Sequence, residues 1–409
     1  MRTPLLNQAL FSAKARARCI AAFFGFLLLL FLGVLSVNRA SAQKPADWAL
    51  QYFYDEVKTE LAIADMACPS ASRCIAVGTI QDRDGRGKPR FTAVVTSDAG
   101  ARWSLVPLRE QPRSVFFLNE DAGWMLTRDG IWFTEEAGRA WTRIADQLKP
   151  NRKLDRAPDS GLLLRLWFVD ARHGYGVGLQ KSIYETKDGG HTWSPLEEAA
   201  KPSSNPAFSY YARIAFADAR HGLMIGGYAP PRRGSDDSLP DWMDPERALK
   251  RREVPTLTLE VETRDGGATW RSSTAPLIGS IVSLHLANAN GLAVFGYADS
   301  FAWPSEVVHL DLKNGKSQSV FKQKDRRVTD SAIFGEGPAF LAAVEPPGQL
   351  ASAPVPGKVR ILTSDNLTNW TEMKVDYRAV GRSVVLSGPD PSHLWAATDT
   401  GMILFLNRK

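Results

Sequence analysis

Cysteine and histidine are scarce in this 409-residue chain, and this scarcity sets the first limits on its function. The sequence contains three cysteines and six histidines, and they do not have the spacing of a zinc site or another metal site. It has no Gly-rich phosphate loop, no Ser-His-Asp order and no nucleic-acid-binding motif. We therefore expect no metal, no cofactor and no nucleic-acid partner.

Acidic residues are absent from residues 1–42, although this segment contains five basic residues. The rest of the chain carries a net charge of only +1, which gives no electrostatic reason to bind nucleic acid. After the basic residues comes an uncharged, apolar run at 20–37, and the small residues at 40–42 then precede Gln43. This order is typical of a cleaved export signal, so we expect a periplasmic or secreted protein. The alternative is an uncleaved membrane anchor, because 18 apolar residues reach the lower limit for spanning a bilayer.

Only Cys68 and Cys74 remain after this segment, because Cys19 lies within it. Two cysteines separated by five residues in an exported chain favour a local disulfide. Two independent buried thiols are the alternative.

One eight-residue pattern recurs along the chain. It is clearest in Thr186-Lys-Asp-Gly-Gly-His-Thr-Trp193 and in Thr263-Arg-Asp-Gly-Gly-Ala-Thr-Trp270. An Asp carboxylate can accept backbone N–H groups across a hairpin turn, and the glycines allow positive φ. We therefore predict a structural hairpin turn at each copy, with Asn314-Gly315 as a different hairpin turn in the longest gap. The acidic residues of the predicted Asp-box turns are Asp98, Glu136, Asp188, Asp265 and Asp365.

The strands around these turns predict the architecture. Before each turn, an apolar strand, a polar turn and a short strand recur, as in residues 165–178 and 213–227. Four short strands per repeat of roughly 40 to 50 residues are typical of an all-β β-propeller. We count seven inner strands, with six or eight blades as alternatives, and assign residues 43–409 to a single seven-bladed domain. Because the last repeat ends after three strands, we expect the segment beginning at Trp48 to close the seventh blade.

These turns resemble Asp-box (BNR) repeats. The paired pattern Phe-x-Asp-x-x-x-Gly and Thr-x-Asp-Gly-Gly-x-Thr-Trp is similar to the photosystem II stability and assembly factor family. The resemblance implies a seven-bladed propeller that acts as a chaperone for a membrane-protein complex. Asp-boxes also occur in sialidases and sortilin-like receptors, so the repeat does not establish an activity.

A hydrolase reading has weaker support in the sequence. The segment Tyr211-Ala-Arg-Ile-Ala215 is the nearest match to the sialidase Phe/Tyr-Arg-Ile-Pro motif, but it lacks the proline. We also find no convincing pair of carboxylates for acid–base catalysis. We therefore assign no catalytic residue and expect a non-enzymatic protein.

Charged residues at the starts of the inner strands are the first partner-binding candidates. Together, four guanidinium groups at the mouth of a central channel would attract carboxylates or an acidic peptide. The assembly-factor family has a comparable arginine patch. The alternative is structural, with these groups pairing with acids and carbonyls of neighbouring blades. The candidates are Arg113, Arg165, Arg213 and Arg382, with Asp65 at the similar position of the first blade.

Insertions between the second and third strands of four repeats are predicted to emerge on the same face. The longest includes Trp242, which we add to the partner-binding candidates. Such loops carry recognition in many folds, although tolerated surface decoration is the alternative. We expect binding to a protein partner in an envelope or membrane complex. The second hypothesis is a glycan-binding or divergent sialidase-like propeller, with Trp242 and Trp303 stacking on sugars. The insertions span residues 81–90, 228–255, 299–306 and 346–358.

Overall fold

The computed structural model describes residues 47–154, 161–230, 257–276, 279–297, 303–335, 337–345 and 356–407. The predicted export signal, Trp242 and much of three insertions lie outside the described residues. None of the described helices is long and apolar enough to cross a membrane. The two short 3-10 helices are η1 (Glu197–Ala200) and η2 (Pro206–Phe208).

The described strands form seven antiparallel sheets, which we number as blades in chain order. Blade 1 contains β2 (Thr59–Ala67), β3 (Cys74–Asp82), β4 (Arg90–Thr96) and β5 (Ser104–Leu108). Blade 2 contains β6 (Pro112–Phe117), β7 (Gly123–Thr127), β8 (Gly130–Thr134) and β9 (Thr142–Asp146). Blade 3 contains β10 (Leu163–Phe168), β11 (Gly174–Gly178), β12 (Ser182–Thr186) and β13 (Ser194–Pro195). Blade 4 contains β14 (Ser209–Phe216), β15 (Gly222–Tyr228), β16 (Leu257–Thr263) and β17 (Arg271–Ala275).

The remaining blades follow the same order. Blade 5 contains β18 (Ser280–Ala287), β19 (Asn290–Gly296), β20 (Ser305–Asp311) and β21 (Lys316–Phe321). Blade 6 contains β22 (Arg327–Ala332), β23 (Ala339–Val344), β24 (Gly357–Ser364) and β25 (Thr371–Glu372), and β26 (Val380–Gly381) also pairs with β24. Blade 7 contains β27 (Val384–Ser387), β28 (Trp395–Thr398), β29 (Met402–Leu406) and β1 (Trp48–Phe53).

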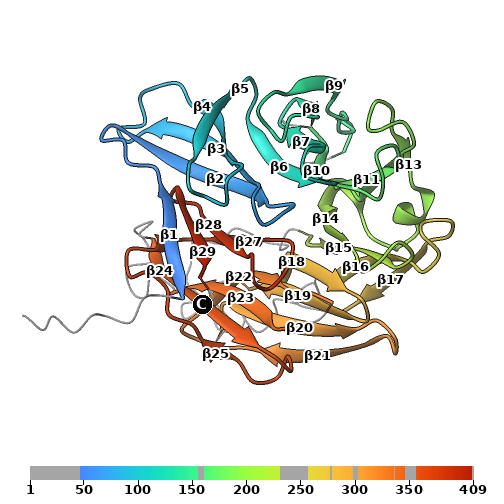
Figure 1. Cartoon of the computed structure of the whole chain (residues 1–409). Coiled ribbons are helices and arrows are strands. Elements are labelled where there is room, and N and C mark those ends of the chain that lie inside the picture. The colour runs from blue at the N-terminus through green and yellow to red at the C-terminus, as the bar shows by residue number, and fades with distance from the viewer. Residues whose placement is uncertain are drawn as a thin grey trace, which may run out of the picture. The chain divides into compact units, whose positions relative to one another are not determined.

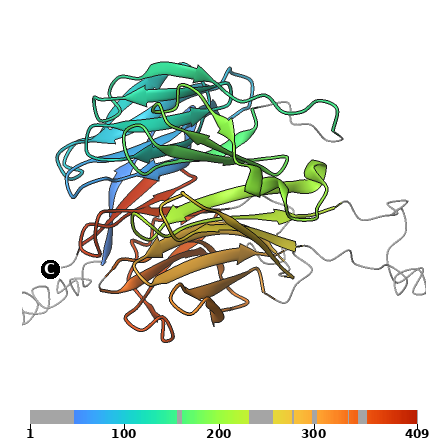
Figure 2. The same cartoon turned by 90° about the vertical axis from the view of Figure 1, so that its right-hand side faces the viewer.

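The blades succeed one another around a ring (Figure 1). Each inner strand contacts the inner strands of both neighbouring blades, and β2 of blade 1 contacts β27 of blade 7. Turned by 90°, the sheets pack face to face (Figure 2). Because both faces of a blade are covered, the second strands are almost entirely buried, as all five residues of β7 show. The predicted seven-bladed all-β propeller is confirmed.

The N-terminal strand closes the circle of blades, as the incomplete last repeat predicted. β1 pairs with β29, with Trp48 opposite Leu406, and the two strands lie side by side in Figure 1. Trp48 is completely buried, and its indole N–H donates to the Met373 sulfur at 3.3 Å. Because β29 is paired with β28 on one side and with β1 on the other, it leaves no unpaired edge.

A β-bulge interrupts the pairing of the inner strand with the second strand in blades 1 to 6. In blade 4 the bulge lies between Tyr211 and Arg213, and Arg213 then pairs with Ile225. The bulge brings the carbonyl of Tyr210 against Gly226, where a Cβ atom would lie 1.8 Å from that oxygen. In blades 1 and 3, Gly78 and Gly178 lie similarly close to the equivalent carbonyl groups of their own blades. A bulge can redirect the side chain that follows it, and here that side chain comes to line the channel.

Cys68 at the end of β2 and Cys74 at the start of β3 are joined as a disulfide. The bond spans the turn between the first two strands of blade 1, as the short cysteine spacing indicated.

Candidate functional site

The two best copies of the repeated turn have the same hydrogen bonds. Asp188 Oδ1 accepts from the Thr192 amide at 2.9 Å, and its Oδ2 accepts from the Thr192 hydroxyl at 2.6 Å. Asp265 accepts from the amide and hydroxyl of Thr269 at 2.8 and 2.5 Å. The hydroxyl bonds, with the amide bonds, lower the pKa of both carboxyl groups to about 2. Among the described residues, the side chains of both acids therefore form hydrogen bonds only within their own turns.

Two other turns keep an aspartate but change the residues that donate to it. Asp98 accepts from the amide and the guanidinium of Arg102 at 2.9 and 3.0 Å. The turn of blade 5 uses Asp311 with Asn314 and Gly315, whose φ is +63°. This confirms the predicted Asn-Gly turn.

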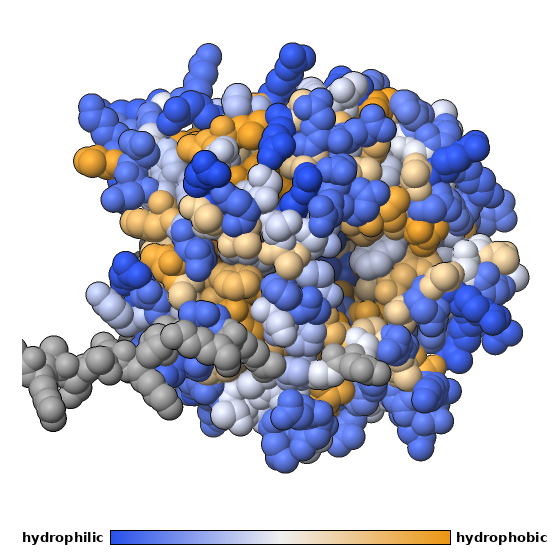
Figure 3. All heavy atoms as spheres, viewed as in Figure 1, coloured by the Kyte–Doolittle hydropathy of each residue, from blue (hydrophilic) through white to orange (hydrophobic). Residues whose placement is uncertain are grey.

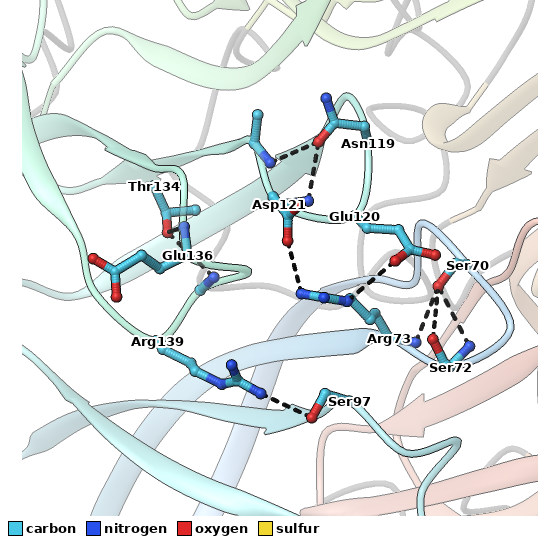
Figure 4. Close-up of polar contacts among 12 residues, drawn as sticks. Ser70, Ser72, Arg73, Ser97, Asn119, Glu120, Asp121, Thr134, Glu136 and Arg139 are labelled. Carbon is cyan, nitrogen blue, oxygen red and sulfur yellow. Dashed lines mark hydrogen bonds and ion pairs between the residues drawn. The ribbon is translucent and has the colours of Figure 1, made fainter.

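Two predicted turn acids do not have the expected role. The Glu136 carboxylate extends away from its turn in Figure 4 and has no hydrogen bond among the described residues. In blade 6 the turn is one residue shorter, so Asn366 takes the acceptor position and bonds to the amides of Thr368 and Asn369 at 3.0 and 2.8 Å. Asp365 therefore lies one residue before the acceptor position that the repeat pattern assigned to it.

Blades 1 and 2 are also joined by a polar cluster at these turns (Figure 4). Arg73 of blade 1 points toward the first turn of blade 2 and contacts Glu120 at 3.2 Å and Asp121 at 2.8 Å. Arg139 donates to the Ser97 hydroxyl at 2.8 Å. These exposed or half-buried contacts link turns, and they indicate a structural role.

The central channel has a different organisation. The residue that follows each bulge, and its equivalent in blade 7, occupies one level of the channel, which we call the ring. Each of the seven pairs with the residue at the corresponding place in the second strand of its blade. From blade 1 to blade 7 the ring residues are Asp65, Ser114, Arg165, Arg213, Ser283, Asp330 and Val385.

A cavity of about 440 Å³ extends from the ring toward the carboxyl ends of the inner strands. Six of the seven ring residues line it, and all seven blades contribute. A second layer lies two residues further along each inner strand, on the same side of the sheet. This layer consists of Ala67, Phe116, Trp167, Ala215, His285, Ala332 and Ser387.

The two ring acids complete the exposed edges of neighbouring inner strands. Asp65 Oδ2 accepts from the Val115 amide of the next blade at 3.0 Å. Asp330 Oδ2 accepts from the Leu386 amide of the next blade at 2.8 Å. An edge strand otherwise leaves such amides unpaired, so these carboxylates stabilise the ring itself.

Asp330 is also bonded within the cavity. Its Oδ1 accepts from the Ser283 hydroxyl at 2.5 Å and contacts the His285 Nε2 at 3.2 Å. Burial by itself would raise the pKa of Asp330, but His285, Ser283 and the Leu386 amide keep it below its ordinary value. Asp330 is therefore held as a carboxylate.

The two ring arginines lie on adjacent blades and differ in their partners. Arg165 Nη1 contacts Asp65 Oδ2 at 2.9 Å, across the width of blade 2. Among the described residues, Arg213 donates to two carbonyls, through Nε to Val282 at 2.6 Å and through Nη1 to Ala212 at 2.8 Å. Burial and the Arg165 charge lower the pKa of Arg213 to about 9. This side of the ring is thus positively charged, and blades 6 and 1 carry the acids.

The structure brings together only part of the predicted arginine mouth. Asp65, Arg165 and Arg213 line the cavity, whereas Arg113 and Arg382 do not. Arg113 is the bulged residue of β6, so Ser114 takes the ring position and Arg113 donates to the Leu163 carbonyl of blade 3 at 2.9 Å.

Arg382 precedes β27 and forms an exposed ion pair with Asp399 at 3.0 Å. Trp242 lies outside the described residues.

Sequence reasoning missed Ser114, Ser283, His285 and Asp330. A signal for the ring was present, because the ring residue lies five positions before the residue that begins the first turn of each blade. In blades 1, 2, 3, 4 and 7 the side chain of that turn residue accepts from amides two and three positions later. Counting back five residues from Asn119 reaches Ser114 and not Arg113.

Trp303 is not an open stacking platform. Lys322 Nζ lies 3.9 Å from the centre of its ring, in a cation–π contact. Lys322 also contacts Glu306 at 3.3 Å. One face of the indole is therefore covered by the chain's own side chain.

The surface seen in Figure 3 is mixed. Hydrophilic residues lie around its rim, and apolar residues gather between them nearer the middle. A mixed surface of this kind is common in protein–protein interfaces.

Comparison with known proteins gives both sequence and structural relatives. No model of a known protein family matches the chain. The photosystem II assembly protein Ycf48 of Thermosynechococcus vestitus is 23% identical over 260 residues, which cover 60% of this chain and 70% of that protein. The predicted resemblance to photosystem II assembly factors is thus confirmed.

Three solved structures share the fold. A structure described as YCF48 bound to D1 peptide has a TM-score of 0.50 and 14% identity, and the match covers 90% of this chain and all of that one (100%). YCF48 from Cyanidioschyzon merolae has a TM-score of 0.53 and 13% identity, with 89% and 99% covered. An ancestral GH74 enzyme has a TM-score of 0.51 and 11% identity, with 88% of this chain and 46% of that one covered. At these identities the structural similarity shows the propeller fold alone.

Proposed function

We propose that this chain is an exported, non-enzymatic propeller that binds a segment of a protein partner. It would assist the assembly or stability of an envelope or membrane protein complex. The observation that carries the proposal is the pair Arg165 and Arg213, which face one cavity from adjacent blades. The similarity to Ycf48, a photosystem II assembly protein, supports the same function.

The charge distribution favours an acidic partner segment. Guanidinium groups bind carboxylates with directional, charge-assisted hydrogen bonds. The Asp65 and Asp330 carboxylates already accept hydrogen bonds from backbone amides and side chains around the channel. Arg213 is left to attract an incoming carboxylate.

The contacts in the cavity support binding over glycoside hydrolysis. A hydrolase needs one carboxylic acid whose pKa is raised so that it can protonate the leaving group. The pKa of Asp330 is instead lowered, and Asp65 is paired with Arg165. The covered face of Trp303 also weakens the case for sugar stacking.

Export rests on the sequence of residues 1–42, with cleavage before Gln43 as the first choice and an anchor at 20–37 as the second. An exported chain would meet its partner outside the cytoplasm, where a Cys68–Cys74 disulfide is stable.

Crosslinking in the source cell, followed by affinity purification and mass spectrometry, tests this function. We expect a specific envelope protein with the unaltered chain and its loss with Arg213→Gln. Arg382→Gln removes the same charge outside the cavity and should retain the partner. The function is wrong if no envelope protein is enriched, and the arginine assignment is wrong if both variants behave alike.

A further inference from the structure

Arg213 has hydrogen-bonding capacity that the described residues do not use. Its Nε and Nη1 donate to carbonyls, whereas Nη2 has no hydrogen-bond partner in the described part of the chain. No described carboxylate forms an ion pair with Arg213, although Arg165 has Asp65. Asp330 and Asp65 act on the buried Arg213 guanidinium through their charges but form no ion pair with it. A carboxylate in the cavity would give this guanidinium the direct partner that it lacks among the described residues.

The layer beside the ring adds an aromatic wall. Trp167 follows Arg165 by two residues and lies on the same side of β10. Phe116 lines the cavity from blade 2, and its ring centre is 5.1 Å from that of Trp167. Both side chains are only partly buried, so they offer apolar surface to the cavity.

We propose that the channel binds a small organic carboxylate, with its carboxylate on Arg213 and its apolar part against Trp167 and Phe116. Ligand sites typically combine an apolar wall with a few placed polar groups. A cavity of about 440 Å³ lies within the usual range for small-molecule sites. The ligand is a free molecule, so the site stands whether or not the channel also contacts a protein.

The aromatic wall separates this ligand from an inorganic anion. Phosphate would satisfy the guanidinium, but it would leave Trp167 and Phe116 facing water. A carboxylate attached to an aromatic or aliphatic group would cover them and gain the hydrophobic contribution. Benzoate carries both features and serves as the probe.

Isothermal titration of the purified full chain with benzoate, at constant ionic strength, tests the site. We expect saturable binding at one site, at least tenfold weaker in Arg213→Met and clearly weaker in Trp167→Leu. Arg271→Met is the matched control, because Arg271 is exposed on β17, the outermost strand of the same blade. It should bind benzoate as the unaltered chain does.

Three results would overturn the site: no saturable binding to the unaltered chain, equal loss in Arg271→Met, or inorganic phosphate binding as tightly as benzoate. Circular dichroism and the melting temperature show whether each variant is folded. If Arg213→Met does not fold, Arg213→Lys keeps the charge and removes the planar fork. Unchanged benzoate binding in a folded Arg213→Lys variant would exclude guanidinium recognition.

Discussion

The hairpin turns and the channel ring use the same repeat in opposite ways. At the turns, Asp188 and Asp265 make the same bonds in different blades, with distances that agree within about 0.1 Å. At the ring, the equivalent position carries an acid, a serine, an arginine or a valine, depending on the blade. The repeated bonds maintain each blade, whereas the varied position gives the channel a charged side. We therefore expect recognition to depend on the position that varies from blade to blade.

The largest expected effect concerns a residue that serves the fold alone. Trp48→Ala should destabilise the protein by about 3–5 kcal/mol, because it removes a fully buried indole from the strand that closes blade 7. Chemical denaturation measures this loss. Phe53→Ala in the same strand is the control, since Phe53 is 44% exposed, and it should cost far less. Equal losses would mean that burial in β1 does not determine closure.

A substitution in the second strand, behind the ring, should affect both the stability of the blade and ligand binding in the channel. Gly226→Ala places a methyl group against the Tyr210 carbonyl and should cost about 1–3 kcal/mol, as overpacking does. Because the bulge that this glycine accommodates positions Arg213, benzoate binding should weaken as well.

The control for this change is Gly296→Ala. There the nearest atom to the new Cβ is a Val282 methyl at 3.0 Å, which can move aside. Denaturation midpoints of the two variants distinguish them. A harmless Gly226→Ala would show that the bulge tolerates a side chain.

The smallest expected effect tests whether the turns are equivalent. Both turn acids have a pKa of about 2, below the ordinary value. Their contribution to stability is therefore present above about pH 4 and is lost as the pH falls toward 2. Thr192→Val and Thr269→Val each remove a hydroxyl donor and should raise the pKa of Asp188 and Asp265, respectively, by the same amount. A carboxyl NMR titration measures both, and a shift in one turn only would contradict the equivalence.

The sequence predicted those features that depend on local turn chemistry. Asp-Gly-Gly and Asn-Gly mark hairpins through backbone preference alone, so the blades and their number followed. The closing strand followed from counting, because Trp48 supplied the strand that the last repeat lacks.

The ring was only partly predicted, for a physical reason. A bulge adds one residue to a strand, and a single-residue shift exchanges the side chains between the two faces of a sheet. Arg113 was therefore placed where Ser114 lies. Asp330 and Ser283 gave no separate signal, because their roles depend on contacts with neighbouring blades.

The pairing of β1 with β29 also determines when the propeller can close during synthesis. β1 leaves the ribosome before any other described strand, but its partner is among the last to be made. The first strand must therefore remain unpaired while six blades are completed, and the circle of blades closes only once β29 has been made. A product truncated before Met402 would expose both β1 and the edge of β28, which is a template for aggregation. Closure of the propeller thus distinguishes chains that contain β29 from chains that lack it.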